Sequence, residues 1–147
     1  MRQPVYFLSH GGGPWPWMPD MQASYAPLIA ALRAIPAALP RRPEAILMVS
    51  AHWITRGGVL LGSHPRPGML YDYSGFPAHT YEIRYPAPGS PALAARAADL
   101  LRADGISVDF DAQRGFDHGA FVPAYVMFPE ADIPMVQLSI ERGFDPD

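Results

Sequence analysis

The 147-residue chain contains five histidines, the side chains best suited to metal binding and to proton transfer near neutral pH: His10, His52, His64, His79 and His118. His10 and His52 each follow a short apolar run, 5–8 and 45–50, of the kind that forms a buried strand. Ligands of open α/β sheets bind beyond the carboxyl ends of strands, so the two imidazoles are expected to converge on one site. Neutral imidazoles bind zinc or ferrous iron, and two of them need a third protein ligand. The spacing leaves open a metal site or two strand ends capped by hydrogen bonds.

His118 lies in the sequence Gly-Phe-Asp-His-Gly at 115–119, which is expected to form a turn between a strand and a short helix. Its imidazole can transfer protons near pH 7, and the adjacent Asp117 can either set its tautomer or face solvent. A third metal ligand and a loop histidine bonded to backbone are the competing interpretations. His64 and His79 flank the 71–77 loop, where exposed loop histidines are a commoner outcome than lining of a substrate mouth.

The apolar periodicity predicts a single α/β domain over residues 1–147, with a mainly parallel central sheet flanked by helices. Strands are expected at 5–8, 45–50, 57–62, 81–85, 106–110 and 134–140, and helices at 25–39, 91–103 and about 120–128. Pro36 should end or kink the first helix, and Gly105 is a candidate C-cap of the second. Residues 141–147 resemble the start of another connection, so the domain is expected to lack its C-terminal part.

The composition excludes several classes of function. A formal net charge of −3, with no lysine, gives no basic excess for nucleic-acid binding. The absence of cysteine rules out disulfides, thiolate metal sites and a cysteine nucleophile. No apolar stretch approaches the roughly 20 residues that span a bilayer, and no signal peptide is recognisable, so a cytoplasmic location without membrane attachment is expected. The glycines at 11–13 lack the spacing of a phosphate loop, and no serine-hydrolase elbow is present.

Two loops that flank the expected site are rich in aromatic residues: Trp15, Trp17, Tyr71, Tyr73 and Phe76. These side chains can either form a pocket for a planar substrate or serve ordinary loop packing.

Six ordered segments together resemble the class III extradiol ring-cleavage dioxygenases, and in particular their 4,5-DOPA dioxygenase branch. The segments are Ser-His-Gly-Gly-Gly-Pro at 9–14, Ser-Ala-His-Trp at 50–53, Tyr-Asp-Tyr-Ser-Gly-Phe-Pro at 71–77, Tyr-Pro-Ala-Pro-Gly at 85–89, Gly-Phe-Asp-His-Gly at 115–119 and Ile-Pro-Met-Val-Gln-Leu-Ser-Ile at 133–140. The resemblance spans nearly the whole chain.

The resemblance implies a non-haem site in which His10 and His52 are metal ligands and His118 is an acid/base histidine near the substrate. It implies Fe(II) for activity, with Zn(II) as a metal that the site can also bind. The substrates would be a small aromatic diol of the catechol type and O2, and the product a ring-opened semialdehyde. A further metal ligand and another histidine would come from chain beyond residue 147, so no third ligand is expected here. Association into a homo-oligomer is left open.

Two alternatives remain at this point. A zinc-dependent hydrolase would use His10 and His52 to hold a metal-bound water, and it would turn over esters or amides without oxygen. An inactive metal-binding fragment would need a partner, or the missing C-terminal segment, to complete its site.

Overall fold

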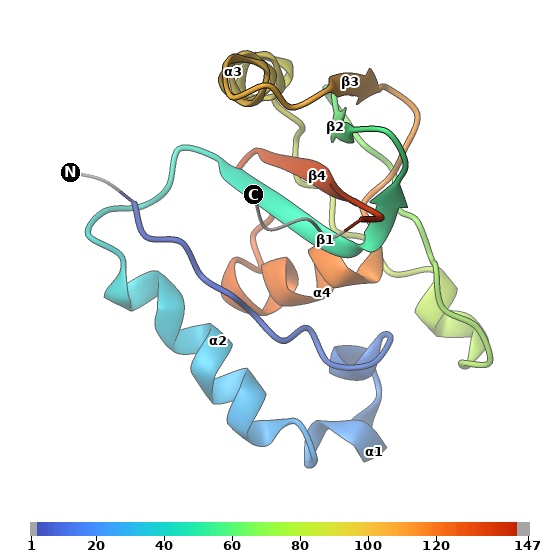
Figure 1. Ribbon diagram of the computed structural model, residues 1–147. Coiled ribbons are helices and arrows are strands. Elements are labelled where there is room, and N and C mark those ends of the chain that lie inside the picture. The colour runs from blue at the N-terminus through green and yellow to red at the C-terminus, as the bar shows by residue number, and fades with distance from the viewer. Residues whose placement is uncertain (1–2, 144–147) are drawn as a thin grey trace.

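The computed structural model describes residues 3–143, which form one four-stranded sheet with helices on both sides (Figure 1). The strands lie in the order β1 (Ile46–Thr55), β4 (Met135–Glu141), β2 (Val59–Gly62) and β3 (Val108–Asp111). β1 pairs with β4 and β2 with β3 in parallel, whereas β2 pairs with β4 antiparallel. The predicted α/β domain with a mainly parallel sheet is therefore confirmed.

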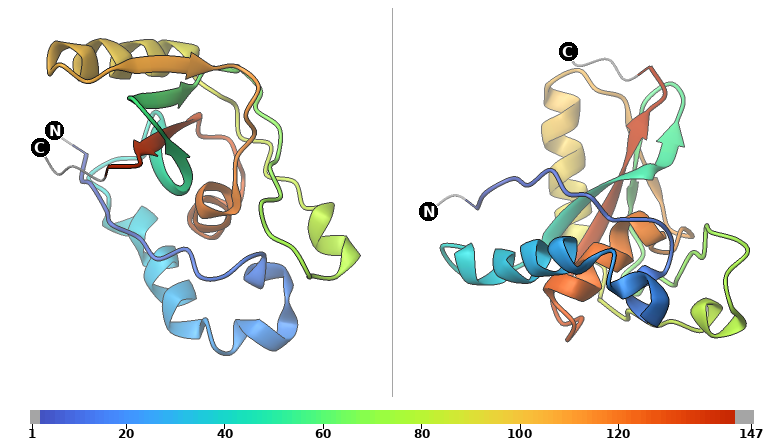
Figure 2. Two further views of the ribbon diagram at one scale, coloured as in Figure 1. Left: turned by 45° about the vertical axis from the view of Figure 1, so that its right-hand side comes forward. Right: turned by 90° about the horizontal axis from the view of Figure 1, so that it is seen from below.

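The three longer helices cover opposite sides of the sheet (Figures 1 and 2). α4 (His118–Met127) contacts β1, and α2 (Ala26–Ala38) contacts the outer side of α4. α3 (Pro91–Ala103) packs against β2, β3 and β4. Three short helices, η1 (Trp15–Trp17), α1 (Pro19–Gln22) and η2 (Ala78–Tyr81), lie in the connections.

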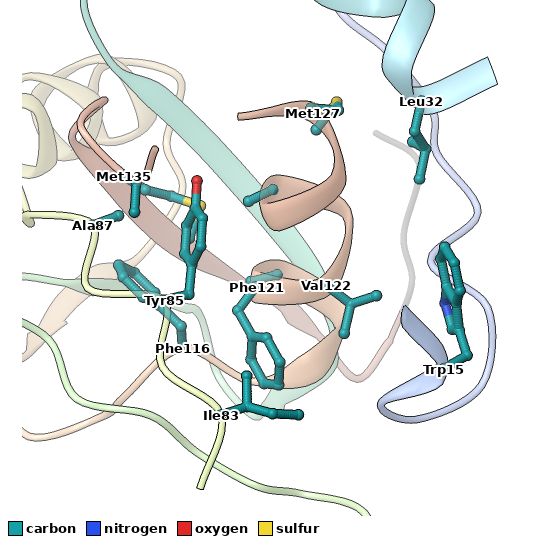
Figure 3. Packing of buried hydrophobic residues seen from close by; sticks show 13 residues of the cluster. Trp15, Leu32, Ile83, Tyr85, Ala87, Phe116, Phe121, Val122, Met127 and Met135 are labelled. Atoms are coloured by element: carbon teal, nitrogen blue, oxygen red, sulfur yellow. The ribbon is translucent and has the colours of Figure 1, made fainter. Parts of the chain in front are cut away.

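The main core surrounds α4, which is apolar on almost every face because it is enclosed by the sheet, α2 and the connection around residue 85. Its largest buried side chains include Trp15, Tyr85, Phe116 and Phe121 (Figure 3). A second, smaller core lies between α3 and strands β2, β3 and β4, and Leu61 and Val136 are buried there. The first core fixes the position of the amino end of α4.

Several predicted elements are confirmed because local signals determine them. α3 has the predicted bounds: the Ser90 hydroxyl accepts a hydrogen bond from the Leu93 N–H, Pro91 occupies the first turn, and Gly105 follows the helix with φ +83°. α2 ends at Ala38, close to the predicted boundary at residue 39, although it runs through Pro36 rather than ending there.

Two predicted strands are wrong. The apolar segment 5–8 belongs to no strand, and the side chains of Val5 and Phe7 are almost fully exposed. Segment 81–85 likewise joins no ladder, because Ile83 and Tyr85 are buried against α4 as core side chains. An apolar run becomes a strand only where a second strand supplies its backbone partners.

The expected start of a further connection falls largely on residues 144–147, which lie outside the described residues. Within residues 3–143, none of the helices combines the length and the apolar character needed to cross a membrane.

Candidate metal centre

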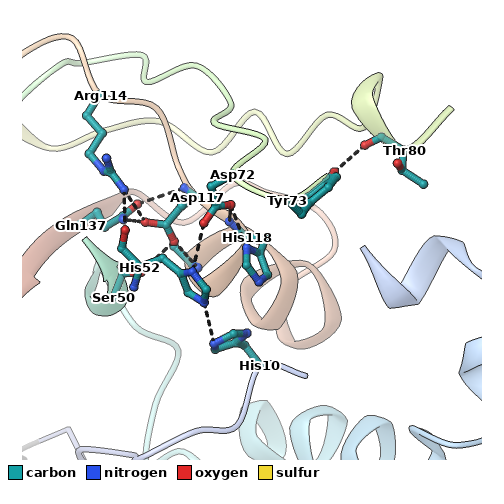
Figure 4. A network of polar contacts seen from close by, with 11 residues as sticks. His10, Ser50, His52, Asp72, Tyr73, Thr80, Arg114, Asp117, His118 and Gln137 are labelled. Carbon is teal, nitrogen blue, oxygen red and sulfur yellow. Dashed lines mark hydrogen bonds and ion pairs between the residues drawn. The ribbon is translucent and has the colours of Figure 1, made fainter. Parts of the chain in front are cut away.

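Three imidazoles from three separate segments converge at the amino end of α4 (Figure 4). His10 comes from the loop before η1, His52 from β1, and His118 is the first residue of α4. One potential ligand atom of each ring lies within 4.8 Å of the other two. The Nε2 atoms of His10 and His52 are 3.2 Å apart. The expected convergence of His10 and His52 is therefore present in the structure.

An irregularity in β1 places His52 at this point. Val49 pairs with Leu138 and Ile54 with Ile140, so five steps along β1 oppose only two along β4. Residues 50–53 leave the ladder here, and such bulges redirect side chains. His52 thus lies inside an interrupted strand rather than at the strand end that the sequence suggested. Its ring packs on Gly119, where an added Cβ would be 2.8 Å from His52 Cδ2.

The loop that carries His10 is fixed by two aromatic residues. The Trp15 indole N–H donates a hydrogen bond to the His10 carbonyl at 2.7 Å, and the Gly12 N–H donates to the Tyr25 hydroxyl at 2.9 Å. The Trp15 and Tyr25 rings stack with centroids 4.7 Å apart. Gly11 has φ +70°, and a Cβ there would lie 2.5 Å from Trp15 Nε1, so both the turn and the packing require glycine.

A buried polar network supports the residues behind His52. Asp117 is fully buried, and one of its oxygens accepts hydrogen bonds from the Ser50 hydroxyl at 2.7 Å and the Ala120 N–H at 3.1 Å. Its other oxygen accepts from the Gln137 amide and from Arg114 at 3.0 Å. Arg114 also donates to the carbonyl of His52 at 3.1 Å. Asp117 therefore caps α4 and anchors β1, and it neither faces solvent nor hydrogen-bonds the His118 ring, the two roles considered for it above.

The carboxylate beside His118 comes instead from Asp72, which sequence reasoning did not single out. Its Oδ1 is 2.7 Å from His118 Nδ1 and accepts from the His118 backbone N–H at 3.0 Å. Its Oδ2 is 3.2 Å from His52 Nδ1. Burial alone would raise the pKa of Asp72, but the hydrogen bonds from His118 outweigh it and lower that pKa to about 2. Asp72 is therefore a carboxylate at neutral pH.

The aromatic residues of the two loops divide between the core and the site. Trp15 is fully buried, in keeping with ordinary packing, and Trp17 packs on Tyr125 with centroids 4.5 Å apart. The Tyr73 ring lies edge-on to the rings of His118 and Phe76, with centroids 5.7 Å and 5.5 Å away. Tyr73 thus forms an aromatic wall beside the imidazoles.

His64 and His79 remain outside the cluster. Both are exposed: His64 Nδ1 accepts a hydrogen bond from the Arg66 N–H, and His79 Nε2 is 3.2 Å from the carbonyl of Trp17. The expected exposure of both residues is confirmed, but His79 lies in the short helix η2 rather than in a loop.

The donor set fits a divalent ion held by His10 and His52. Bonds of 2.0–2.1 Å to one ion would separate two neighbouring imidazole nitrogens by about 3.0–3.4 Å, which brackets the 3.2 Å observed between their Nε2 atoms. The other ring nitrogen of His10, Nδ1, is buried without a hydrogen-bond partner. Burial, and then the neighbouring His118 and His52 rings, lower the pKa of His10, which favours the neutral, metal-binding form.

His118 gives the chain a third imidazole within ligand range. The family resemblance implied that the third ligand would come from chain beyond residue 147, whereas the residues around His118 left a ligand role open for it, and the described residues bring three ring nitrogens together. His118 can therefore be considered both as an acid/base and as a ligand.

Comparison with known proteins identifies the family. A sequence profile described as the catalytic LigB subunit of aromatic ring-opening dioxygenase matches residues 4–144. The chain belongs to the LigB family. This LigB-family chain is 46% identical to "Dioxygenase tasH" of Hapsidospora irregularis, over 97% of the chain and 45% of that protein. It is 42% identical to "4,5-DOPA dioxygenase extradiol" of Beta vulgaris, over 96% of the chain and 51% of that protein.

Relatives in Escherichia coli support the same placement. The LigB-family chain is 43% identical to the "4,5-DOPA dioxygenase extradiol" of strain K12, over 97% of the chain and 49% of that protein. The crystal structure of an uncharacterized protein from E. coli K12 superimposes with a TM-score of 0.58 at 44% identity, over 77% of this chain and 40% of that one. The resemblance to the 4,5-DOPA dioxygenase branch is thereby confirmed. The chain spans about half the length of the curated relatives it matches.

Proposed function

We propose that this chain carries the metal-binding part of an extradiol dioxygenase that opens the ring of a catechol-type substrate with O2 to give a semialdehyde. The observation that carries this proposal is the convergence of His10, His52 and His118 from three separate segments. Membership of the LigB family and the names of the relatives, which include 4,5-DOPA dioxygenases, support the reaction class.

His10 and His52 would hold the metal through their Nε2 atoms, which face each other. When bound, Fe(II) would supply the redox chemistry that couples O2 to the substrate, which Zn(II) cannot supply because it has no second accessible oxidation state. The neutral form of His10, favoured by its lowered pKa, suits a metal ligand.

His118 would serve as the acid/base group through Nε2, because its Nδ1 is engaged by Asp72 at 2.7 Å. His118 is 6% exposed, so a proton that Nε2 takes up during the reaction would be largely shielded from bulk water. Its centroid lies 5.1 Å from that of His10 and 4.1 Å from that of His52, which keeps it next to the proposed ligands. A positioned acid/base group of this kind contributes about 10²–10⁴-fold to a rate.

Tyr73 would help to orient the aromatic substrate, because its ring stands beside His118 and offers an edge-on partner for a planar molecule. Its hydroxyl donates a hydrogen bond to the Thr80 carbonyl at 2.5 Å, which keeps the ring in place. Burial raises the pKa of Tyr73 to about 12, so the phenol keeps its proton at neutral pH and remains the donor in this hydrogen bond.

The decisive experiment is oxygen uptake by protein loaded with Fe(II) under anaerobic conditions and then mixed with DOPA and O2. We expect catechol-dependent oxygen consumption with formation of a coloured semialdehyde, and no ring opening by the same protein loaded with Zn(II). Full turnover with zinc alone would contradict the proposed redox role of iron, and ester hydrolysis without O2 would favour the zinc hydrolase.

The alternative that this chain holds only part of the active site is favoured by its length, which is about half that of its relatives. It predicts that the 147-residue chain binds one Fe(II) but consumes no oxygen. Metal content and oxygen uptake measured on the same sample distinguish the two proposals.

A further inference from the structure

Asp72 places one carboxylate between two of the three imidazoles, and each of its oxygens faces a different ring (Figure 4). Oδ1 is 2.7 Å from His118 Nδ1, and Oδ2 is 3.2 Å from His52 Nδ1. The Asp72 side chain is 17% exposed. One residue from the connection between β2 and η2 thus contacts groups on both β1 and α4.

The contact determines where each imidazole carries its proton. A neutral imidazole has one N–H and one bare nitrogen, and a carboxylate can only accept a hydrogen bond. The nitrogen that faces the carboxylate is therefore the one that carries the hydrogen. In His118 this is Nδ1, which hydrogen-bonds Asp72 Oδ1, whereas in His52 the carboxylate oxygen Oδ2 lies at ion-pair distance and favours the hydrogen on Nδ1 through its charge. Both Nε2 atoms are then left with their lone pairs, and in the metal-free chain that of His52 faces His10 Nε2 at 3.2 Å, where it can accept a hydrogen bond from the His10 ring.

The structure holds Asp72 firmly enough for this role. The His118 backbone N–H donates a second hydrogen bond to Oδ1 at 3.0 Å, which ties the carboxylate to the first turn of α4. Before Asp72, the Leu70 N–H donates to the Phe116 carbonyl at 2.8 Å. On either side of it, the hydroxyls of Tyr71 and Tyr73 donate to the carbonyls of Ile83 and Thr80. The carboxylate is therefore positioned before any ligand arrives.

We propose that Asp72 is a positioning residue that fixes the Nδ1–H tautomer of His52 and His118 together and so directs both Nε2 lone pairs toward one shared point. The nature of the ion bound there rests on the proposed function, whereas the tautomers are a property of the metal-free chain. A carboxylate behind a metal-binding histidine orients the ring and raises its basicity, and losing such a partner typically lowers metal affinity about 10–100-fold.

The first test is a long-range ¹H–¹⁵N correlation spectrum of the metal-free, ¹⁵N-histidine-labelled protein at about pH 8.5, where imidazoles of ordinary pKa are neutral. We expect His52 and His118 to show the Nδ1–H pattern. The wild-type spectrum suffices for this test, so it does not depend on the folding of a variant. An Nε2–H pattern for both residues would overturn the proposal.

The second test compares Asp72→Asn with the control Asp99→Asn, which removes the same charge from an exposed position on α3. The amide has one accepting oxygen, so we expect at least one of the two rings to switch to Nε2–H. Zn²⁺ affinity, measured by competition with a chelator, should fall about 10–100-fold in Asp72→Asn and remain within about twofold in the control. Unchanged tautomers with unchanged affinity in Asp72→Asn would overturn the proposal. If oxygen uptake fails in a wild type that shows both expected tautomers and binds Zn²⁺, the proposed function fails and the role of Asp72 stands.

Discussion

Replacing Asp117 by alanine should cost this protein much of its stability, because that buried carboxylate connects three structural elements. The change removes the acceptor for Arg114, Ser50 and Gln137 and removes the N-cap of α4. Breaking a buried charge pair by deleting one partner costs about 3–5 kcal/mol, and the loss of an N-cap adds about 1 kcal/mol. At this chain length each kcal/mol lowers Tm by roughly 2–4 °C, so a decrease of about 8–24 °C is expected.

The assay is urea and thermal unfolding followed by circular dichroism, with Asp117→Asn as the matched variant. Asparagine keeps the shape and is as good an N-cap as aspartate, but it removes the charge that faces Arg114. Its loss of unfolding free energy should therefore fall between those of wild type and Asp117→Ala. A cost below about 1 kcal/mol for Asp117→Ala would refute the view that this network holds β1 to α4.

Three further predictions concern the imidazoles and the core. His10→Ala and His52→Ala should each abolish stoichiometric Zn²⁺ binding in equilibrium dialysis. His118→Ala should instead keep the metal, while its rate of oxygen uptake falls about 10²–10⁴-fold. An empty metal site in His118→Ala would show that His118 is a ligand. Gly119→Ala, whose new Cβ would lie 2.8 Å from His52 Cδ2, should displace that ring and weaken Zn²⁺ binding at least about tenfold. Equal affinity in chelator competition would argue against the close packing. Burial raises the pKa of Tyr85 to about 12, so the neutral phenol's contribution to stability is complete below about pH 10 and is lost as pH rises toward 12. The stability advantage of wild type over Tyr85→Phe in urea unfolding should therefore shrink by about 1 kcal/mol from about pH 9 to about pH 11. A constant difference would contradict this assignment.

The elements that sequence analysis predicted well are those whose signals are local. The bounds of α3 follow from Ser90, Pro91 and Gly105, each of which acts within one turn of the helix. The segments 5–8 and 81–85 carry the same apolar pattern as true strands. Whether these segments form strands depends on backbone partners and core contacts elsewhere in the chain, which a local pattern does not contain.

The site was predictable in part for the same reason. His10 and His52 were expected to converge, and they do. The bulge that turns His52 toward α4 depends on the pairing of β1 with β4, and the residue types at 50–53 do not predict it. Asp72 was overlooked because it is distant from His52 and His118 in sequence, whereas Asp117 attracted attention only because it adjoins His118. Contact in the fold, rather than adjacency in the chain, selects the carboxylate that faces the ring.

His10 and His52 are expected to bind one ion between their Nε2 atoms. Anomalous diffraction from crystals of the protein soaked with Zn²⁺ would locate this ion. We expect one strong peak about 2.0–2.1 Å from the Nε2 atoms of both His10 and His52. A fully occupied ion bound elsewhere, with these two rings turned away from each other, would contradict it.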